Sequence, residues 1–276
     1  MRWMCVFEGG IPMKKWIGTM VLLLCVALCG CSSAPAKITQ IVERNELRVG
    51  VKTDVPYFGY ANPDTGLIEG FEVDLARAFA KAILGNENAV RLVPVNALTR
   101  SILLENDEVD LIIATFTITE ERKKAMNFSQ PYYIDEIGFM VKKESKYASL
   151  ADMNGKRVGV ARSSTAYNDL AESTAQLGVT LTLDNFASYP EAKNALMTER
   201  VDAFAGDKSI LRGYMDMDTV LLDTGLNPQP YGIATKLAAR DFAKFIDDHL
   251  AVMQEDGTMD ALKKQWLGTS ADWIRR

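Results

Sequence analysis

Two threonines and an arginine within eight residues have the chemistry to hold a small anion. Thr115, Thr117 and Arg122 offer two hydroxyls and a guanidinium, and a guanidinium fits a carboxylate with two parallel hydrogen bonds. Thr119, followed by two glutamates, is typical of a helix N-cap, and a helix N-terminus also favours an anion. The segment predicts a carboxylate site, with Arg122 as a solvated helix charge left open as the alternative.

The elements that must position these residues follow from hydrophobic patterning. Strands are predicted over 47–51, 90–95 and 109–116, with helices over 70–84 and 96–105 between them. This alternation favours a parallel sheet that binds ligands at the carboxyl ends of its strands. Lys52, Asn96 and Thr115 each follow such a strand, so we expect them to converge.

A second set of elements follows residue 132. Strands are predicted over 137–141, 157–161, 181–186, 201–207 and 231–235, and helices over 149–155, 165–177 and 190–200. Two long amphipathic helices end the chain. We therefore expect an α/β protein with two units, each with its own core.

Composition excludes several classes of protein. The 276 residues are 48% hydrophobic and 24% charged, which is typical of globular chains. A net charge of -5, without long runs of Lys or Arg, gives no sign of a nucleic-acid surface. The four cysteines lie at or before Cys31 and His249 is the only histidine, so the globular part has no disulfide and no His-rich metal site. We expect no metal and no cofactor.

The N-terminus carries a secretion signal. Two lysines after Met13 precede a short apolar stretch, 17–28, which is too short for a confident membrane span. It ends in Leu-Cys-Gly-Cys, which resembles a lipoprotein lipobox with Cys31 as the lipidated residue. We expect residues 1–30 to be a signal peptide, with Met13 as the true start, and 31–36 to be a lipidated tether. A plain secretory peptide is the alternative.

A longer motif indicates a family. Residues 114–124, Ala-Thr-Phe-Thr-Ile-Thr-Glu-Glu-Arg-Lys-Lys, and 127–133, Asn-Phe-Ser-Gln-Pro-Tyr-Tyr, resemble the signature of bacterial extracellular solute-binding proteins for polar amino acids. These are the ligand-capturing subunits of ABC importers. The order of elements resembles their two-lobed type II periplasmic-binding-protein fold over essentially all of 36–268, with two α/β lobes joined by a two-segment hinge.

The resemblance implies a domain plan and a location. Lobe one would comprise 37–131 and 232–276, lobe two 137–226, and the hinge 132–136 and 227–231. The protein would be an extracytoplasmic monomer, anchored to the cell membrane at Cys31, that passes its ligand to an ABC transporter permease and binds no nucleic acid.

The resemblance also implies which residues hold the α-carboxylate and the α-ammonium, the two groups that all amino acid ligands share. Thr115, Thr117, Arg122 and Thr165 match the ligands of the α-carboxylate. Asp207, at a predicted strand end, matches the acceptor of the α-ammonium, and Asp54 matches a second acidic position. The alternatives are a helix cap for Asp207 and a loop turn for Asp54.

The side-chain end would decide the substrate. Lys52 and Arg100 are two cations beyond Arg122, and the segments around them, with those at 186–190 and 201–204, resemble the aspartate/glutamate-binding branch. Tyr57, Tyr60 and Tyr189 are the aromatic residues assigned to this end. Solvated positions for the two cations, and rim packing for Tyr57 and Tyr60, remain alternatives.

Three functions therefore compete. The first is binding of aspartate or glutamate, the second is the same role for glutamine, cystine or histidine, and the third is a dehydratase on the same scaffold. An enzyme needs a general acid or base in the cleft. Asp54 and Asp207 are the obvious carboxylates, and both suit an ammonium better, so we expect a binding protein and not an enzyme.

Overall fold

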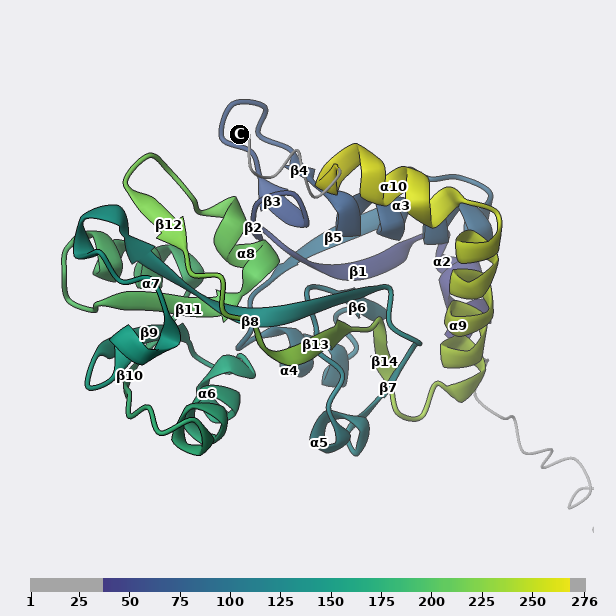
Figure 1. The fold of residues 1–276 in the computed structure, drawn as a ribbon. Coiled ribbons are helices and arrows are strands. Elements are labelled where there is room, and N and C mark those ends of the chain that lie inside the picture. The colour runs from purple at the N-terminus through teal and green to yellow at the C-terminus, as the bar shows by residue number, and fades with distance from the viewer. Residues whose placement is uncertain (1–36, 269–276) are drawn as a thin grey trace, which may run out of the picture. The chain divides into compact units, whose positions relative to one another are not determined.

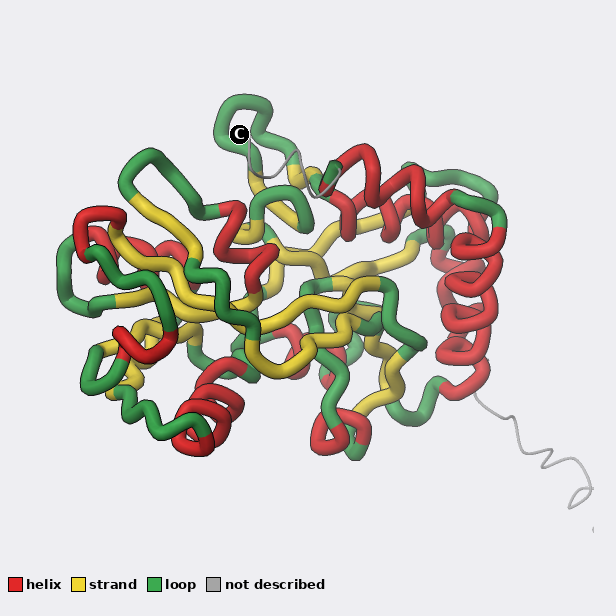
Figure 2. Tube along the Cα trace, viewed as in Figure 1, coloured by secondary structure: helices red, strands yellow, loops and turns green. Residues whose placement is uncertain are grey.

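The structure is a computed structural model that describes residues 37–268, and the predicted signal peptide and Cys31 lie outside that range. Its helices and strands form two β-sheets covered by helices, with a small third sheet (Figures 1 and 2). In this range, no helix is both long and apolar enough to cross a membrane, and His, Cys, Asp and Glu nowhere gather into a group able to hold a metal ion.

The first sheet has five strands in the order β5-β1-β6-β14-β7. They are β1 (Leu47–Lys52), β5 (Val90–Val95), β6 (Leu111–Ile113), β7 (Met126–Phe128) and β14 (Ala234–Lys236). β1 pairs in parallel with β5 and β6, whereas β14 is antiparallel to both of its neighbours. The predicted parallel arrangement is therefore confirmed for β1, β5 and β6. β14, from late in the chain, and β7 complete the sheet.

Helices cover both faces of this sheet. Along β6, Leu111 and Ile113 join one apolar cluster and Ile112 joins another, as alternate residues of a strand should. The first cluster contains α2 (Lys37–Arg44), α3 (Phe71–Leu84), α9 (Arg240–Glu255) and α10 (Thr258–Leu267), and the second contains α4 (Arg100–Glu105). Figure 1 shows α10 beside α3 and α9 beside α2.

The second sheet has six strands. They are β8 (Tyr133–Lys142), β9 (Arg157–Ala161), β10 (Thr182–Phe186), β11 (Ala203–Asp207), β12 (Thr219–Leu221) and β13 (Leu226–Tyr231), in the order β10-β9-β11-β8-β12 with β13 also paired to β8. Its helices are α6 (Ala166–Gln176), α7 (Tyr189–Met197) and α8 (Lys208–Gly213). α6 and α7 belong to different apolar clusters, so they cover different faces of the sheet.

Two extended segments that lie side by side connect the two large sheets. The first residues of β8 pair with the last residues of β13, from Tyr133 opposite Tyr231 to Glu136 opposite Pro228. Tyr231 stacks on Tyr133, with ring centroids 5.7 Å apart, and also packs edge-on against Phe58. Buried aromatic packing therefore surrounds the chain at both crossings.

Some element boundaries differ from those predicted, for local reasons. The helix predicted from Asn96 begins at Arg100, because the Asn96 side chain accepts hydrogen bonds from the next turn's backbone N–H groups. The strand predicted to reach residue 116 ends at Ile113, since Thr115 adopts a left-handed conformation with φ of 44°. The strand predicted over 231–235 is two strands, with Tyr231 ending β13 and Ala234 beginning β14 in the other sheet. The segment predicted as a helix over 149–155 is a short 3-10 helix, Leu150–Met153.

A three-stranded sheet near the first β-strand was not predicted. It consists of β2 (Asp54–Val55), β3 (Gly59–Ala61) and β4 (Ile68–Glu69). Gly59 permits its close approach, because a Cβ atom there would lie 2.4 Å from the carbonyl oxygen of Lys52. Such strands of two or three residues are too short for an alternating pattern to reveal them.

Candidate ligand-binding site

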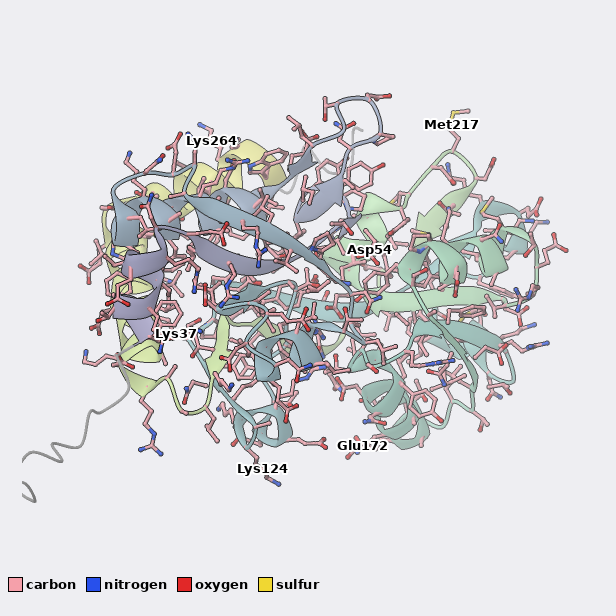
Figure 3. The ribbon with its side chains drawn as sticks, turned by 180° about the vertical axis from the view of Figure 1, so that it is seen from behind. Lys37, Asp54, Lys124, Glu172, Met217 and Lys264 are labelled. Atoms are coloured by element: carbon pink, nitrogen blue, oxygen red, sulfur yellow. The ribbon has the colours of Figure 1, made fainter. Side chains whose placement is uncertain are left out.

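The predicted convergence at the strand ends is confirmed. Lys52 is the last residue of β1, Asn96 follows β5, and Thr115 comes two residues after β6, at one edge of three parallel strands. Asp54 follows Lys52 and is labelled in Figure 3, where it lies between the half of the ribbon that carries Lys37 and Lys264 and the half that carries Glu172 and Met217. The hydroxyl of Tyr214 from the second half donates to the Asp54 carbonyl.

Arg122 is held in place and is not a solvated helix charge. Thr119 caps α5 (Glu120–Lys123) by accepting from the Arg122 backbone N–H at 3.1 Å, as predicted. The guanidinium donates to the Thr117 carbonyl at 2.7 Å and to the Ser163 carbonyl at 3.3 Å, and it lies 4.7 Å from the Phe116 ring centroid. Burial, followed by the charge of Arg100, lowers the pKa of Arg122 to about 9. Within the described range, Arg122 forms no ion pair with a carboxylate.

Thr117 and Thr165 meet at a single acceptor. Both hydroxyls donate to Oε1 of Gln229, at 2.9 and 2.6 Å, and the Gln229 amide donates to Asp169 at 2.9 Å. Thr117 follows the five-stranded sheet and Thr165 directly precedes α6 on the six-stranded sheet. Two of the predicted α-carboxylate donors are thus brought together from different sheets, next to a buried glutamine of β13.

Arg100 is buried behind the Thr115 loop rather than solvated. Only 3% of it is exposed, and its Nη1 donates to the carbonyls of Ala114 and Thr115 at 2.8 and 3.0 Å. Its guanidinium lies 3.8 Å from the Phe116 ring centroid, so Phe116 contacts both Arg100 and Arg122. Two hydrogen bonds to backbone carbonyls and one cation–π contact therefore hold the Arg100 guanidinium in place without neutralising its charge.

Asp207 ends β11 as a buried carboxylate. It makes no side-chain cap to α8, so the helix-cap alternative is wrong. Its Oδ2 accepts from the Tyr231 hydroxyl at 2.5 Å, and the same hydroxyl lies 3.3 Å from Asp135, which also accepts from the Ser209 backbone N–H. Burial and the neighbouring Asp135 charge raise the pKa of Asp207 to about 7, although Tyr231, Arg100 and Arg122 oppose that rise.

Lys52 and Asp54 form an ion pair at 3.2 Å. Lys52 is fully buried and lies 4.7 Å from the Tyr189 ring centroid, so it is not solvated. Burial lowers the pKa of Lys52, and Asp54 opposes that shift. Asp54 therefore already has a cationic partner, unlike Asp207.

The three predicted aromatic residues differ in their surroundings. Tyr189 is 4% exposed and packs against Phe204 and Tyr214 while facing Lys52. Tyr57 is half-buried, has a φ of 70° and packs against the apolar cluster that contains α3. Tyr60 lies in β3 opposite Asp54.

Four residues of this site were not identified from the sequence. Glu72, Asp135 and Gln229 are buried polar groups, and Phe116 contacts two guanidinium groups. Glu72 sits in the apolar stripe of α3, where a single acid was the available signal. Asp135 and Gln229 lie on the paired crossing strands, whose exposed and buried positions cannot be told apart without the partner strand.

Comparison with known proteins places the chain in a family. Residues 47–269 match the model of bacterial extracellular solute-binding proteins, family 3. The chain belongs to this family. It is therefore a solute-binding protein, and the candidate site residues described above lie within the matched region.

Individual relatives agree with that assignment. The chain is 37% identical to a glutamine-binding protein of Geobacillus stearothermophilus, over 84% of this chain and 95% of the relative. It is 34% identical to the ABC transporter glutamine-binding protein GlnH of Bacillus subtilis, over 90% of this chain and 94% of the relative. A crystal structure of a solute receptor for L-cysteine of Neisseria gonorrhoeae superimposes with a TM-score of 0.77 and 28% identity, covering 84% and 94% of the two chains. The predicted two-lobed fold is confirmed.

Proposed function

We propose that the protein binds an acidic amino acid, aspartate or glutamate, between its two sheets and delivers it to the permease of an ABC importer. Family membership and relatives named as amino acid-binding proteins support the general role. The observation that carries the acidic ligand is the burial of two cations, Lys52 and Arg100, in addition to Arg122.

The α-carboxylate would be held by Arg122 with the hydroxyls of Thr117 and Thr165, and Thr115 would complete the set. The two hydroxyls already meet at Gln229, which supports a shared polar position between the sheets. A ligand carboxylate can accept the same hydrogen bonds as the Gln229 side-chain oxygen. It also brings the negative charge that would pair with the Arg122 guanidinium.

The α-ammonium would be held by Asp207. A carboxyl group whose pKa is raised by burial and by a neighbouring carboxylate gains most from an incoming cation. Asp54 was a second predicted acceptor, and its pairing with Lys52 makes it the weaker of the two.

The ligand's side chain would lie toward Lys52 and Arg100, with Tyr57, Tyr60 and Tyr189 around it. Nη1 of Arg100 donates hydrogen bonds to two backbone carbonyls, while its Nε is buried without a hydrogen-bond partner among the described residues. A buried cation with an unused donor favours a carboxylate, because leaving both charge and donor unmatched is costly.

Glutamine is the second candidate, and two observations favour it. Asp54 and Lys52 together offer an acceptor and a donor 3.2 Å apart, which suits a neutral amide, and two relatives are named as glutamine-binding proteins. The two candidates differ in whether the site as a whole carries spare positive charge.

The setting of the protein is part of this proposal. It would be an extracytoplasmic monomer anchored to the membrane by a lipid on Cys31. Lobe one would comprise 37–131 and 232–276, lobe two 137–226, and the hinge 132–136 and 227–231. The distribution of strands between two sheets and the pairing of β8 with β13 support these bounds.

Calorimetric titration of residues 32–276 against the common amino acids tests the ligand. We expect aspartate or glutamate to bind with the highest affinity. Glutamine or cystine binding as tightly as glutamate would contradict the acidic ligand and leave the general binding role intact. In parallel, incubation with prephenate or arogenate tests the dehydratase alternative, and we expect no product.

A further inference from the structure

The backbone N–H and carbonyl of Thr115 are both hydrogen-bonded to buried side chains, one acidic and one basic. Glu72, the second residue of α3, accepts a hydrogen bond from the Thr115 backbone N–H at 2.6 Å. Arg100 donates to the Thr115 carbonyl at 3.0 Å. Thr115 has a φ of 44°, which is unfavourable for a residue with a branched Cβ, so these two side chains hold a strained turn directly before Thr117 and Arg122.

The same three residues carry most of the unsatisfied polar atoms of the described chain. Oε2 of Glu72, Nε of Arg100 and Oγ1 of Thr115 are buried and have no hydrogen-bond partner there. Native proteins pair nearly all such atoms, and exceptions gather where function requires them. These unpaired atoms make the cluster a candidate for a functional role.

The charges around Glu72 come from several elements. Its Oε1 also accepts from the Tyr132 hydroxyl at 2.5 Å, and it interacts electrostatically with Lys52 of β1 and Arg100 of α4. Burial raises the pKa of Glu72 to about 7, against the hydrogen bonds from Tyr132 and Thr115 and the two positive charges. Near neutral pH the carboxyl group can therefore exist with or without its proton.

We propose that Glu72 is a specificity-determining residue, whose buried carboxyl group sets the net charge that Lys52 and Arg100 present to the side chain of the ligand. With Glu72 protonated, the cluster retains the spare positive charge that an acidic side chain needs. With Glu72 ionised, that charge is compensated and a neutral amide is favoured. This inference rests on the proposed function, since it requires the ligand's side chain to lie toward these two cations.

Proton exchange on binding follows from this arrangement. At pH 8, where most Glu72 carboxyl groups of the free protein are ionised, a glutamate ligand should draw up to one proton from solvent onto Glu72, whereas glutamine should not. Both ligands carry the same α-ammonium, so any proton that Asp207 exchanges is common to both and cancels in the difference. The difference between the two proton counts thus reports on the side-chain end of the site.

The experiment is calorimetric titration with glutamate and with glutamine at pH 6 and pH 8, in two buffers of different ionisation enthalpy. For the wild-type protein we expect more proton uptake with glutamate. We also expect the ratio of glutamate to glutamine affinity to fall at least tenfold from pH 6 to pH 8. In Glu72→Gln, which is fixed as neutral, the ratio should no longer depend on pH, and the difference in proton uptake should vanish.

Tyr132→Phe is the matched control. It removes a hydrogen bond from the same carboxylate oxygen but leaves the titratable group. A purely structural role for Glu72 predicts that both variants behave alike, whereas our inference predicts that Tyr132→Phe keeps the pH-dependent ratio. If the difference in proton uptake between glutamate and glutamine persists unchanged in Glu72→Gln, another group is titrating and the inference is wrong.

Two outcomes separate this inference from the proposed function. If the wild-type protein binds only neutral amino acids, the acidic preference fails, but Glu72→Gln should then gain glutamate affinity, and no gain would overturn the inference as well. If Glu72→Gln does not fold, equal proton counts for glutamate and glutamine in the wild-type protein would be enough to overturn it.

Discussion

Two buried aspartates, Asp110 and Asp207, lie in opposite electrostatic surroundings. Asp110 contacts Lys37 at 3.0 Å, Arg44 at 2.5 Å and Arg48 at 3.1 Å. Burial alone would raise the pKa of Asp110, but the Arg48 and Lys37 contacts outweigh it, and the pKa lies below its usual value. This carboxylate is fully compensated and joins α2 to the first strand.

Asp207 forms no ion pair with a cation among the described residues. Its close contact is the neutral hydroxyl of Tyr231, and burial and the charge of Asp135 raise its pKa, which Arg100 and Arg122 offset only in part. The contrast teaches that burial of charge does not by itself mark a binding site. A buried charge with its own cations stabilises the fold, whereas one without them is available to a ligand's ammonium.

The largest effect should come from breaking the compensated cluster. Asp110→Ala leaves three cations without their shared partner, and we expect a loss of roughly 3–5 kcal/mol in the free energy of unfolding. Chemical denaturation measures it. A loss below about 1 kcal/mol would show that the cluster is not structural, and Asp184→Ala, which removes a half-exposed pair with Arg157, serves as the control with an expected loss under about 1 kcal/mol.

Asp207→Asn should weaken ligand binding without lowering the stability of the fold. It removes the charge of the proposed ammonium acceptor but keeps the shape of the side chain, so we expect the free energy of amino acid binding to weaken by roughly 2–5 kcal/mol. The melting temperature of the ligand-free protein should stay the same or rise, because repulsion with Asp135 is relieved. Calorimetry and thermal melting measure the two effects, and unchanged affinity would mean that the ammonium is held elsewhere.

Specificity offers a third test, on the cationic side. We expect acids to bind at least roughly a hundredfold tighter than their amides, about 2.7 kcal/mol. Arg100→Ala should shrink that gap by weakening the acids. Lys52→Ala should shrink it less, because Lys52 is already paired with Asp54 and an ammonium makes a single-point contact. A gap that survives both substitutions would contradict a charged side-chain site.

The smallest effect concerns pH. The pKa of Asp207 is raised from 3.8 to about 7 on folding, so the folded state binds more protons and this group's stabilising contribution is lost as pH rises across that range. Asp207→Asn should remove about 1–2 kcal/mol of this decline between pH 5 and 7, since Tyr231 and Asp135 share the titration. Denaturation curves at several pH values measure it, and an unaltered slope would argue against a raised pKa.

Local patterns predicted much of the fold and part of the site. The convergence of Lys52 and Thr115 at one edge of the sheet and the cap at Thr119 follow from neighbouring residues, and the structure contains them, although the third strand ends earlier than predicted, at Ile113. Gln229 and Glu72 could not be found in this way, because their partners lie 112 and 43 residues away. The pairing of Lys52 with Asp54 is close in sequence, yet whether such neighbours form an ion pair depends on burial that only the fold determines.

The contrast between the two aspartates can be measured in a single sample. Carbon-detected NMR titration of the aspartate carboxyl groups, with and without bound amino acid, should give Asp207 a pKa of about 7 in the free protein and a much lower value with ligand. Asp110 should titrate below 3.8 in both states. An Asp207 pKa near 3.8 in the free protein, or one that ligand leaves unchanged, would contradict an uncompensated carboxylate that waits for the ligand's ammonium.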